Sequence, residues 1–282
     1  MRHSIVIAVC ATVVGLAACA PSGEEQVQEA LEDLNVIDQS NLNEVMLTVA
    51  DPQQAVAHFT AANASFPGRI DLQRGLAKSL VRAKRPNDAI AAWQTVVAND
   101  EAINSDSVGL ADAFVRANQW DNAAATLNTI PPTYETFARY RLEAMVADSR
   151  QQWSKADSFY GTAVELTTRP ATVYNNWGFS KLTRGDYPAA ERLFIDALRF
   201  DPGMFTAKNN LVLARGAQRN YTLPAVTMTQ IERAQLLHTM ALAAIKQNDV
   251  SIGESMLRDA IDTHPQFFEP AVRALEALEN DA

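Results

Sequence analysis

Residues 171–204 read ATVYNNWGFSKLTRGDYPAAERLFIDALRFDPGM and carry the clearest structural pattern in the chain. Gly185 predicts a turn between two amphipathic helices, because glycine readily adopts the backbone conformation that ends a helix. Gly178 and Ala190 are small where two antiparallel helices would approach most closely. Pro202 cannot continue a helix and ends the second one. The stretch therefore predicts an antiparallel helical hairpin.

The same pattern recurs along the chain at a nearly constant interval. A single hairpin of this kind cannot bury its apolar faces, so only a stack of such units is stable. Extending the frame backwards predicts hairpins over roughly 36–69, 70–103, 104–136 and 137–170. The intervals between the small residues near the start of each second helix are 34, 34, 33 and 34, taken from Ala55, Ala89, Ala123, Ala156 and Ala190.

Residues 171–204 closely resemble the tetratricopeptide repeat (TPR). The positions that carry the resemblance are Tyr174, Gly178, Gly185, Tyr187, Ala190, Phe194, Ala197 and Pro202. The resemblance implies an all-α fold, a right-handed TPR superhelix (an α-α solenoid) of about six repeats with a C-terminal capping helix. It also implies a concave, protein-binding face lined by the first helix of each pair.

Three aromatic residues occupy one slot of the repeat. Trp120, Trp153 and Tyr187 each precede the small residue of their second helix by three positions. Aromatic residues at a regular helical position belong more often to the core than to a ligand site, so we assign all three to the core.

The repeat frame breaks near residue 218. Pro224 stands where the next second helix would have its small residue, so a loop is predicted over 219–229. Thr229 and Glu232 have the spacing of a capping box, which predicts that a helix begins there. A TPR-like hairpin and a capping helix are expected over 230–282, after a TPR solenoid over 36–218.

The N-terminal segment predicts export. Residues 1–18 have the pattern of a secretory signal, and Leu16-Ala17-Ala18-Cys19 resembles the bacterial lipobox. The lipobox resemblance implies a lipid on Cys19, and Ala20 favours the outer membrane by analogy. Residues 19–35 are expected to form an acidic tether, although a docking strip for a basic partner would have the same charge. The alternative for the signal is an ordinary secreted protein.

Composition and motifs exclude several classes of function. The chain has 33 acidic against 24 basic residues and a net charge of −9, which gives no electrostatic footprint for nucleic acid. The four histidines lack the spacing of metal ligands, and there is no phosphate loop and no hydrolase motif. We therefore predict a non-enzymatic protein without metal, cofactor or small-molecule substrate. A periplasmic hydrolase with an unrecognised site is the alternative from another class.

The candidate binding residues are those expected on the concave face. Asparagine offers both a donor and an acceptor, so stacked asparagines can hold the backbone of an extended peptide. The alternative is that these side chains only face solvent or cap helices. The predicted peptide-binding groove consists of Asn175, Asn176, Phe179, Leu182, Lys208, Asn209, Asn210 and Leu213.

The layout of the whole chain resembles the TadD-type lipoproteins, which serve assembly of tight-adherence (Flp) pili. Most of that resemblance lies between Asn175-Asn176-Trp177-Gly178 and Asn209-Asn210-Leu211. It implies a pilotin-like lipoprotein at the periplasmic side of the outer membrane, with a secretin or another pilus-assembly component as its protein client. The alternative in the same class is a TPR lipoprotein for outer-membrane protein insertion or regulation of peptidoglycan synthase.

Overall fold

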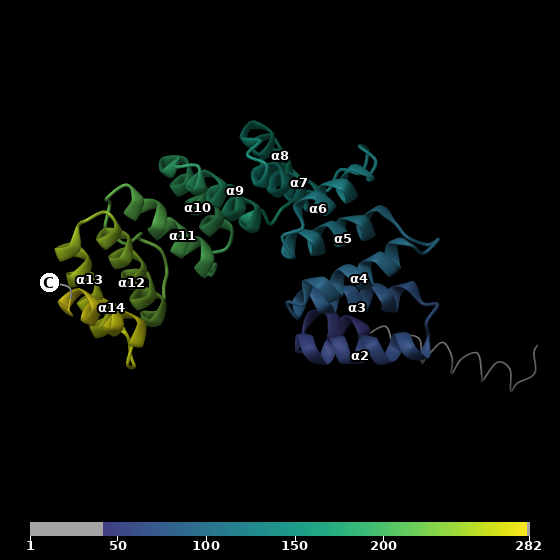
Figure 1. Ribbon diagram of the computed structural model, residues 1–282, viewed down its shortest axis with the longest axis horizontal. Coiled ribbons are helices and arrows are strands. Elements are labelled where there is room, and N and C mark those ends of the chain that lie inside the picture. Colours follow the sequence, from purple (N-terminus) through teal and green to yellow (C-terminus); the bar gives the residue numbers. More distant parts are fainter. Residues whose placement is uncertain (1–41, 281–282) are drawn as a thin grey trace, which may run out of the picture.

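The computed structural model describes residues 42–280, and no strand occurs in that range (Figure 1). The predicted signal, the tether and Cys19 lie outside the described residues. A short helical segment at residues 42–48 precedes the longer helices. These are α2 (Pro52–Ser65), α3 (Ile70–Arg82), α4 (Pro86–Val97), α5 (Asn104–Arg116), α6 (Trp120–Asn128), α7 (Phe137–Ser149), α8 (Trp153–Glu165), α9 (Ala171–Thr183), α10 (Tyr187–Phe200), α11 (Phe205–Ala217), α12 (Gln230–Lys246), α13 (Val250–Thr263) and α14 (Glu269–Asn280).

The helices form hairpins in the predicted frame, which confirms the all-α solenoid. The first helices α3, α5, α7, α9 and α11 begin 34, 33, 34 and 34 residues apart. Each second helix begins three residues before the small residue that defined the frame. Those small residues are fully buried: Ala55, Ala89, Ala123, Ala156 and Ala190.

The turn after each first helix uses one residue in the left-handed region. Gly185 has a φ of 79°, as its predicted role requires. The other turns place larger side chains in this conformation, which costs a residue with a Cβ about 1 kcal/mol or more. These residues are Lys84, Asn118, Gln151, Arg219 and Asn248, with φ between 56° and 68°.

Glycines in three first helices make room for aromatic rings from the second helices. A Cβ on Gly75 would lie 2.3 Å from the ring of Phe59, and one on Gly109 would lie 2.6 Å from Trp93. At Gly178 the ring is that of Phe194, at 2.7 Å. The close approach predicted at Gly178 is thus a contact between backbone and ring.

The hydrophobic core is not uniform along the stack. One cluster of buried side chains runs without interruption from Val56 in α2 to Val146 in α7. Beyond it, the core divides into smaller clusters centred on α7–α8, on α10–α11, and on α12 with its neighbours. The N-terminal half is therefore held by one continuous apolar interior, and the middle of the chain is not.

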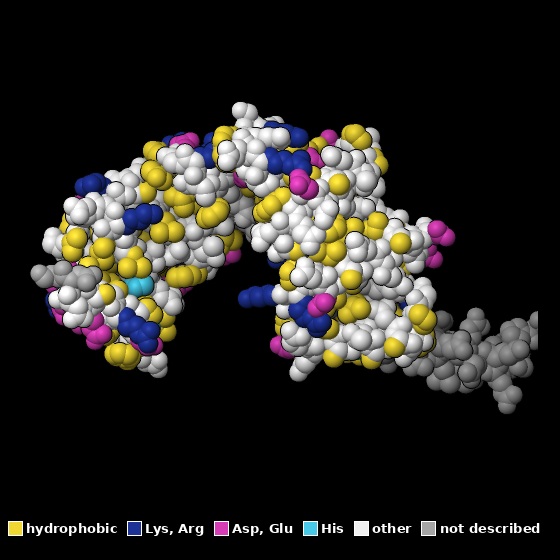
Figure 2. All heavy atoms as spheres, in the orientation of Figure 1, with side chains coloured by type: hydrophobic (Ala, Val, Ile, Leu, Met, Phe, Trp, Pro, Cys, Tyr) yellow, Lys and Arg dark blue, Asp and Glu magenta, His cyan; other side chains and the backbone are white. Residues whose placement is uncertain are grey.

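The first helices form the inner layer of the curved stack. Consecutive first helices (α3, α5, α7, α9 and α11) contact one another. Within the residues that the structure describes, consecutive second helices do not contact one another to the same extent. In a bent stack the layer whose members lie closer together is on the inside, so the first-helix face is the concave one. Figure 1 shows the resulting arch, and Figure 2 shows that it stays hollow with all atoms drawn.

After α11 the chain departs from the repeat, as Pro224 predicted. Residues 218–229 form a loop in place of a second helix, and α12 then begins a new unit with α13 and α14. The predicted capping box is confirmed, because the hydroxyl of Thr229 accepts from the Glu232 backbone N–H at 3.1 Å, and Glu232 accepts from the Thr229 N–H at 2.7 Å. Within residues 42–280, no helix has the length and apolar character needed to cross a bilayer.

Candidate ligand-binding groove

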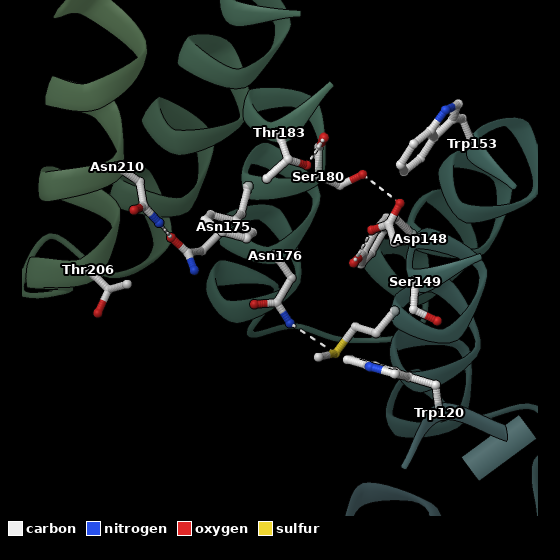
Figure 3. Close-up of a pocket in the computed structure, with 13 residues that line it drawn as sticks. Trp120, Asp148, Ser149, Trp153, Asn175, Asn176, Ser180, Thr183, Thr206 and Asn210 are labelled. Atoms are coloured by element: carbon white, nitrogen blue, oxygen red, sulfur yellow. Dashed lines mark hydrogen bonds between the residues drawn. The ribbon is translucent and has the colours of Figure 1, made fainter. Parts of the chain in front are cut away.

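The central cavity lies on the first-helix face, between α7, α8, α9 and α11 (Figure 3). Its volume is about 460 Å³, and most of its walls are apolar. Asparagine and hydroxyl side chains point into it from α9 and α11 (Figure 3). The lining residues are Trp120, Met145, Asp148, Ser149, Trp153, Tyr160, Asn175, Asn176, Phe179, Ser180, Thr183, Thr206 and Asn210.

Four of the eight predicted groove residues meet in this cavity: Asn175, Asn176, Phe179 and Asn210. The amide of Asn210 donates to Oδ1 of Asn175 at 3.1 Å, and the amide of Asn176 lies 3.6 Å from the sulfur of Met145 (Figure 3). Phe179 is 50% exposed, so its ring is available to a ligand. That these residues bind a peptide stays a prediction.

Three further predicted residues lie toward α12. Leu182 and Leu213 line a second cavity of about 550 Å³ between α9, α11 and α12, which we call the α12 cavity. Asn209 lies at the same junction and accepts a hydrogen bond from the hydroxyl of Thr239 at 2.8 Å. Because α9 and α11 border both cavities, the predicted residues follow one strip of the first-helix face.

Lys208 does not lie on this strip. Its side chain is 3% exposed, and its ammonium group forms an ion pair with Glu232 at 3.0 Å. The backbone N–H of Thr229 and the ammonium of Lys208 both donate to Glu232 and lower the pKa of that carboxyl group. Lys208 thus ties α11 to the start of α12, and the expectation that it faces the groove is corrected.

A polar junction beside the central cavity consists of Asp148, Asp157, Tyr160, Ser180 and Arg184. Asp148, Tyr160 and Ser180 line the cavity. Asp148, in the last turn of α7, accepts hydrogen bonds from the hydroxyls of Ser180 at 2.6 Å and Tyr160 at 2.9 Å. Burial raises the pKa of Asp148, and these two hydrogen bonds only partly oppose that shift. Burial also raises the pKa of Tyr160.

Asp157 is the hydrogen-bond acceptor for the basic side chains at the polar junction. It accepts from Lys181 at 2.9 Å, from Arg184 at 2.7 Å and from the indole N–H of Trp177 at 2.6 Å. Burial of Asp157 opposes ionisation, but these donors outweigh it and lower its pKa to about 2. The guanidinium of Arg184 also lies over the ring of Trp153, 5.1 Å from its centroid.

The aromatic slot of the repeat was assigned to the core, and Trp120 does pack against the N-terminal apolar cluster, but all three aromatic side chains also line a cavity. Trp120 and Trp153 are half-buried and line the central cavity, and Tyr187 lines the α12 cavity. All three are the first residue of a second helix, so they adjoin the end of the preceding first helix. That helix-start position is the signal that could have placed them beside the groove.

The perturbed pKa values at this site follow from packing between helices. Asp148, Asp157 and Tyr160 are each bonded to neighbours across the polar junction. In the part of the chain that the structure describes, no group of three or more His, Cys, Asp or Glu side chains is placed to hold a metal ion.

The fold is that of the tetratricopeptide repeat proteins. Residues 74–135 match the family described as Tetratricopeptide repeat. Among solved structures, the chain superposes on the APC/C hetero-tetramer Cut9-Hcn1 with a TM-score of 0.60 and 13% identity, covering 83% of this chain and 47% of that one. A tetratricopeptide repeat protein from Parabacteroides merdae ATCC 43184 matches with a TM-score of 0.53 and 12% identity, over 90% of this chain and 98% of the other.

A curated relative shares only part of the chain. The serine/threonine-protein kinase PknG of Mycolicibacterium smegmatis is 33% identical over 97 residues, which is 34% of this chain and 13% of the kinase. The chain therefore spans a small fraction of that relative.

Proposed function

We propose that this protein is a non-enzymatic scaffold that binds a segment of a client protein along its first-helix face. The observation that carries the proposal is the central cavity, where apolar walls lie beside amide side chains on two neighbouring first helices. Apolar walls with a few convergent polar groups are typical of binding sites. The similar Cut9-Hcn1 structure is a hetero-tetramer, an assembly between proteins, which supports the same class of function.

The proposed binding mode uses both cavities. A client segment lies across α9 and α11, with one side chain in the central cavity and another in the α12 cavity. Asn175 and Asn176 exchange hydrogen bonds with its backbone, which requires no particular client sequence. Phe179 contributes apolar contact, because half of its surface is open to solvent.

The proposal extends to an anchor and a place in the cell. A lipid on Cys19 would hold the scaffold at the periplasmic side of the outer membrane, with residues 19–35 as the tether. Anchoring raises the local concentration of a bound client at the membrane. The resemblance to TadD-type lipoproteins supports a client from a pilus-assembly machine, such as its secretin.

The test is photo-crosslinking in cells. A photoreactive residue is placed at Thr206, which is exposed and lines the central cavity, and a matched control is placed at the exposed Ser158 on α8. We expect one client, identified by mass spectrometry, to be captured from Thr206 and not from Ser158. Equal capture from both positions, or from neither, would contradict the proposed binding face.

The identity of the client separates the two lipoprotein roles. A pilus secretin or its partner supports the pilus role, and a cell-wall synthase or an outer-membrane insertion factor supports the alternative. A Cys19→Ser variant tests the anchor, since it should become soluble in the periplasm. Its persistence in the membrane fraction would contradict lipidation at Cys19.

A further inference from the structure

The central cavity has an unusual charge balance. Of the thirteen residues that line it, Asp148 is the one acidic residue and none is basic. Each carboxylate oxygen of Asp148 accepts from a neutral hydroxyl, and no basic side chain within residues 42–280 forms an ion pair with it. The cavity therefore presents a negative charge that no direct cationic partner balances.

The basic side chains at the polar junction are already engaged by Asp157. Arg184 donates to the hydroxyl of Ser180 at 3.0 Å, but its two charge-assisted contacts go to Asp157. Lys181 also forms its closest ion pair with Asp157, at 2.9 Å. A partly buried carboxylate is stabilised by a nearby cation, so a ligand that brings one gains free energy that a neutral ligand does not.

The walls around Asp148 are suited to a cation on an aliphatic stem. Trp120 and Phe179 give the cavity aromatic surfaces, and Met145 adds a flexible apolar one. Aromatic faces attract cations through the ring quadrupole, and they also cover the methylene groups of lysine and arginine. The guanidinium of Arg184 already lies over the ring of Trp153, which is a cation–aromatic contact of the same kind within the chain.

We propose that the central cavity takes a lysine or arginine side chain of the client segment, with its stem against the aromatic walls and its charged end toward Asp148. This inference rests on the proposed function and specifies the residue that the client presents. Asn176 lies one turn along α9 from Ser180, the partner of Asp148, and its amide reaches Met145 (Figure 3), so this amide can hold the client backbone beside that residue.

The experiment measures binding of short Gly-Ser peptides that carry an uncharged fluorophore and one varied central residue. Fluorescence anisotropy compares arginine, lysine, citrulline, norleucine and glutamate at neutral pH and physiological salt. We expect the arginine and lysine peptides to bind at least about tenfold more tightly than the citrulline and norleucine peptides, a difference of the size expected for one charge-assisted contact. Equal or tighter binding of norleucine, or no binding of any peptide, would overturn the inference.

A variant pair assigns the preference to Asp148. Asp148→Asn keeps the shape of the side chain and removes its charge, so the preference for arginine over citrulline should fall to about twofold or less. Glu165→Gln removes the same charge from an exposed position at the end of α8 and should leave the preference unchanged. If Asp148→Asn does not fold, Trp120→Ala is used, and it should weaken the arginine and lysine peptides while the Glu165→Gln control does not.

The crosslinking experiment separates failure of this inference from failure of the proposed function. A client captured from Thr206 through a segment without lysine or arginine would overturn the inference and leave the scaffold role standing. Absence of any client would contradict the scaffold role itself.

Discussion

The stack from α2 to α6 and the junction between α7–α8 and α9 are built from the same repeat, yet they are stabilised differently. In the N-terminal stack, aromatic rings pack against the backbone of glycines, as Trp93 packs against Gly109. The buried apolar side chains of this stack form one continuous cluster. At the polar junction, Asp148 and Asp157 connect the helices through hydrogen bonds and ion pairs. Three residues of the polar junction also line the central cavity.

The two regions also differ in the cavities beside them. The polar junction supplies Asp148, Tyr160 and Ser180 to the lining of the central cavity. The contact between Trp93 and Gly109 borders another cavity, of about 550 Å³. Apolar interlocking does not exclude a cavity next to it, so the central cavity is distinguished by its hydrogen-bonded polar wall and not by the presence of space.

The largest expected effect tests whether apolar packing dominates stability. Trp93 is 4% exposed, and Trp93→Ala should lower the free energy of unfolding by about 3–5 kcal/mol. Tyr160→Phe keeps a buried ring and removes the hydrogen bond to Asp148, so it should cost about 1 kcal/mol. Urea unfolding followed by circular dichroism measures both losses, and equal losses would contradict the stated difference between the two regions.

A glycine pair tests the ring contacts directly. Gly109→Ala places a methyl group 2.6 Å from the buried Trp93 ring, and overpacking of this kind costs about 1–3 kcal/mol. Gly161 in α8 has open space around the same added atom, so Gly161→Ala should stabilise by about 0.5–1 kcal/mol through helix propensity. Thermal denaturation should therefore show a lower melting temperature for Gly109→Ala and a higher one for Gly161→Ala. A change in the same direction for both variants would contradict the packing role of Gly109.

The polar junction should show its own pH dependence. The pKa of Asp157 is lowered to about 2. Its contribution to the free energy of unfolding is therefore fully present above the ordinary pKa near 3.8 and is lost as the pH falls toward 2. Asp157→Asn should destabilise the protein by about 1–2 kcal/mol at neutral pH, and by much less near pH 2.

Asp148 provides the matched control for that measurement. Burial raises its pKa, so protonation favours the folded state and the sign of its contribution is opposite. Asp148→Asn should therefore cost less at neutral pH than Asp157→Asn. Urea unfolding of both variants between pH 2 and neutral pH checks this, and a larger loss for Asp148→Asn would contradict the assigned roles.

The smallest expected effect concerns the turns. Gly185→Ala in the turn after α9 introduces a Cβ at a φ of 79° and should cost about 1 kcal/mol. Lys84→Gly in the N-terminal stack removes the Cβ from a residue in the same backbone conformation and should raise the free energy of unfolding. The added freedom of the unfolded chain limits this gain in stability to less than about 1 kcal/mol. A loss in Lys84→Gly would show that the lysine side chain itself stabilises the turn.

The sequence predicted the fold because the same constraint recurs in every repeat. Fully buried positions such as Ala55 and Ala190 admit only a small residue, and the turn and the helix-ending proline restrict the rest. The interruption at Pro224 was equally visible, because proline cannot occupy that helical position. These are local rules, and local rules can be read without coordinates.

The binding site was only partly predictable, because its other half depends on distant partners. Asn175 and Asn210 were found by their position on first helices, and the structure brings them together at 3.1 Å. Lys208 was misplaced because its partner, Glu232, belongs to the unit after the loop. The contact between Asp148 and Ser180 joins residues 32 positions apart, and no repeat pattern indicates it.

The order of packing along the chain also bears on how the protein is made. Each hairpin contacts mainly its immediate neighbours, and the largest apolar cluster is complete once Val146 has emerged from the ribosome. Because the contacts in this core join residues that are close in sequence, the N-terminal half can become compact while the rest of the chain is still being synthesised. Synthesis from the N-terminus thus supplies the continuous apolar core first, and the later helices pack onto a surface that has already formed.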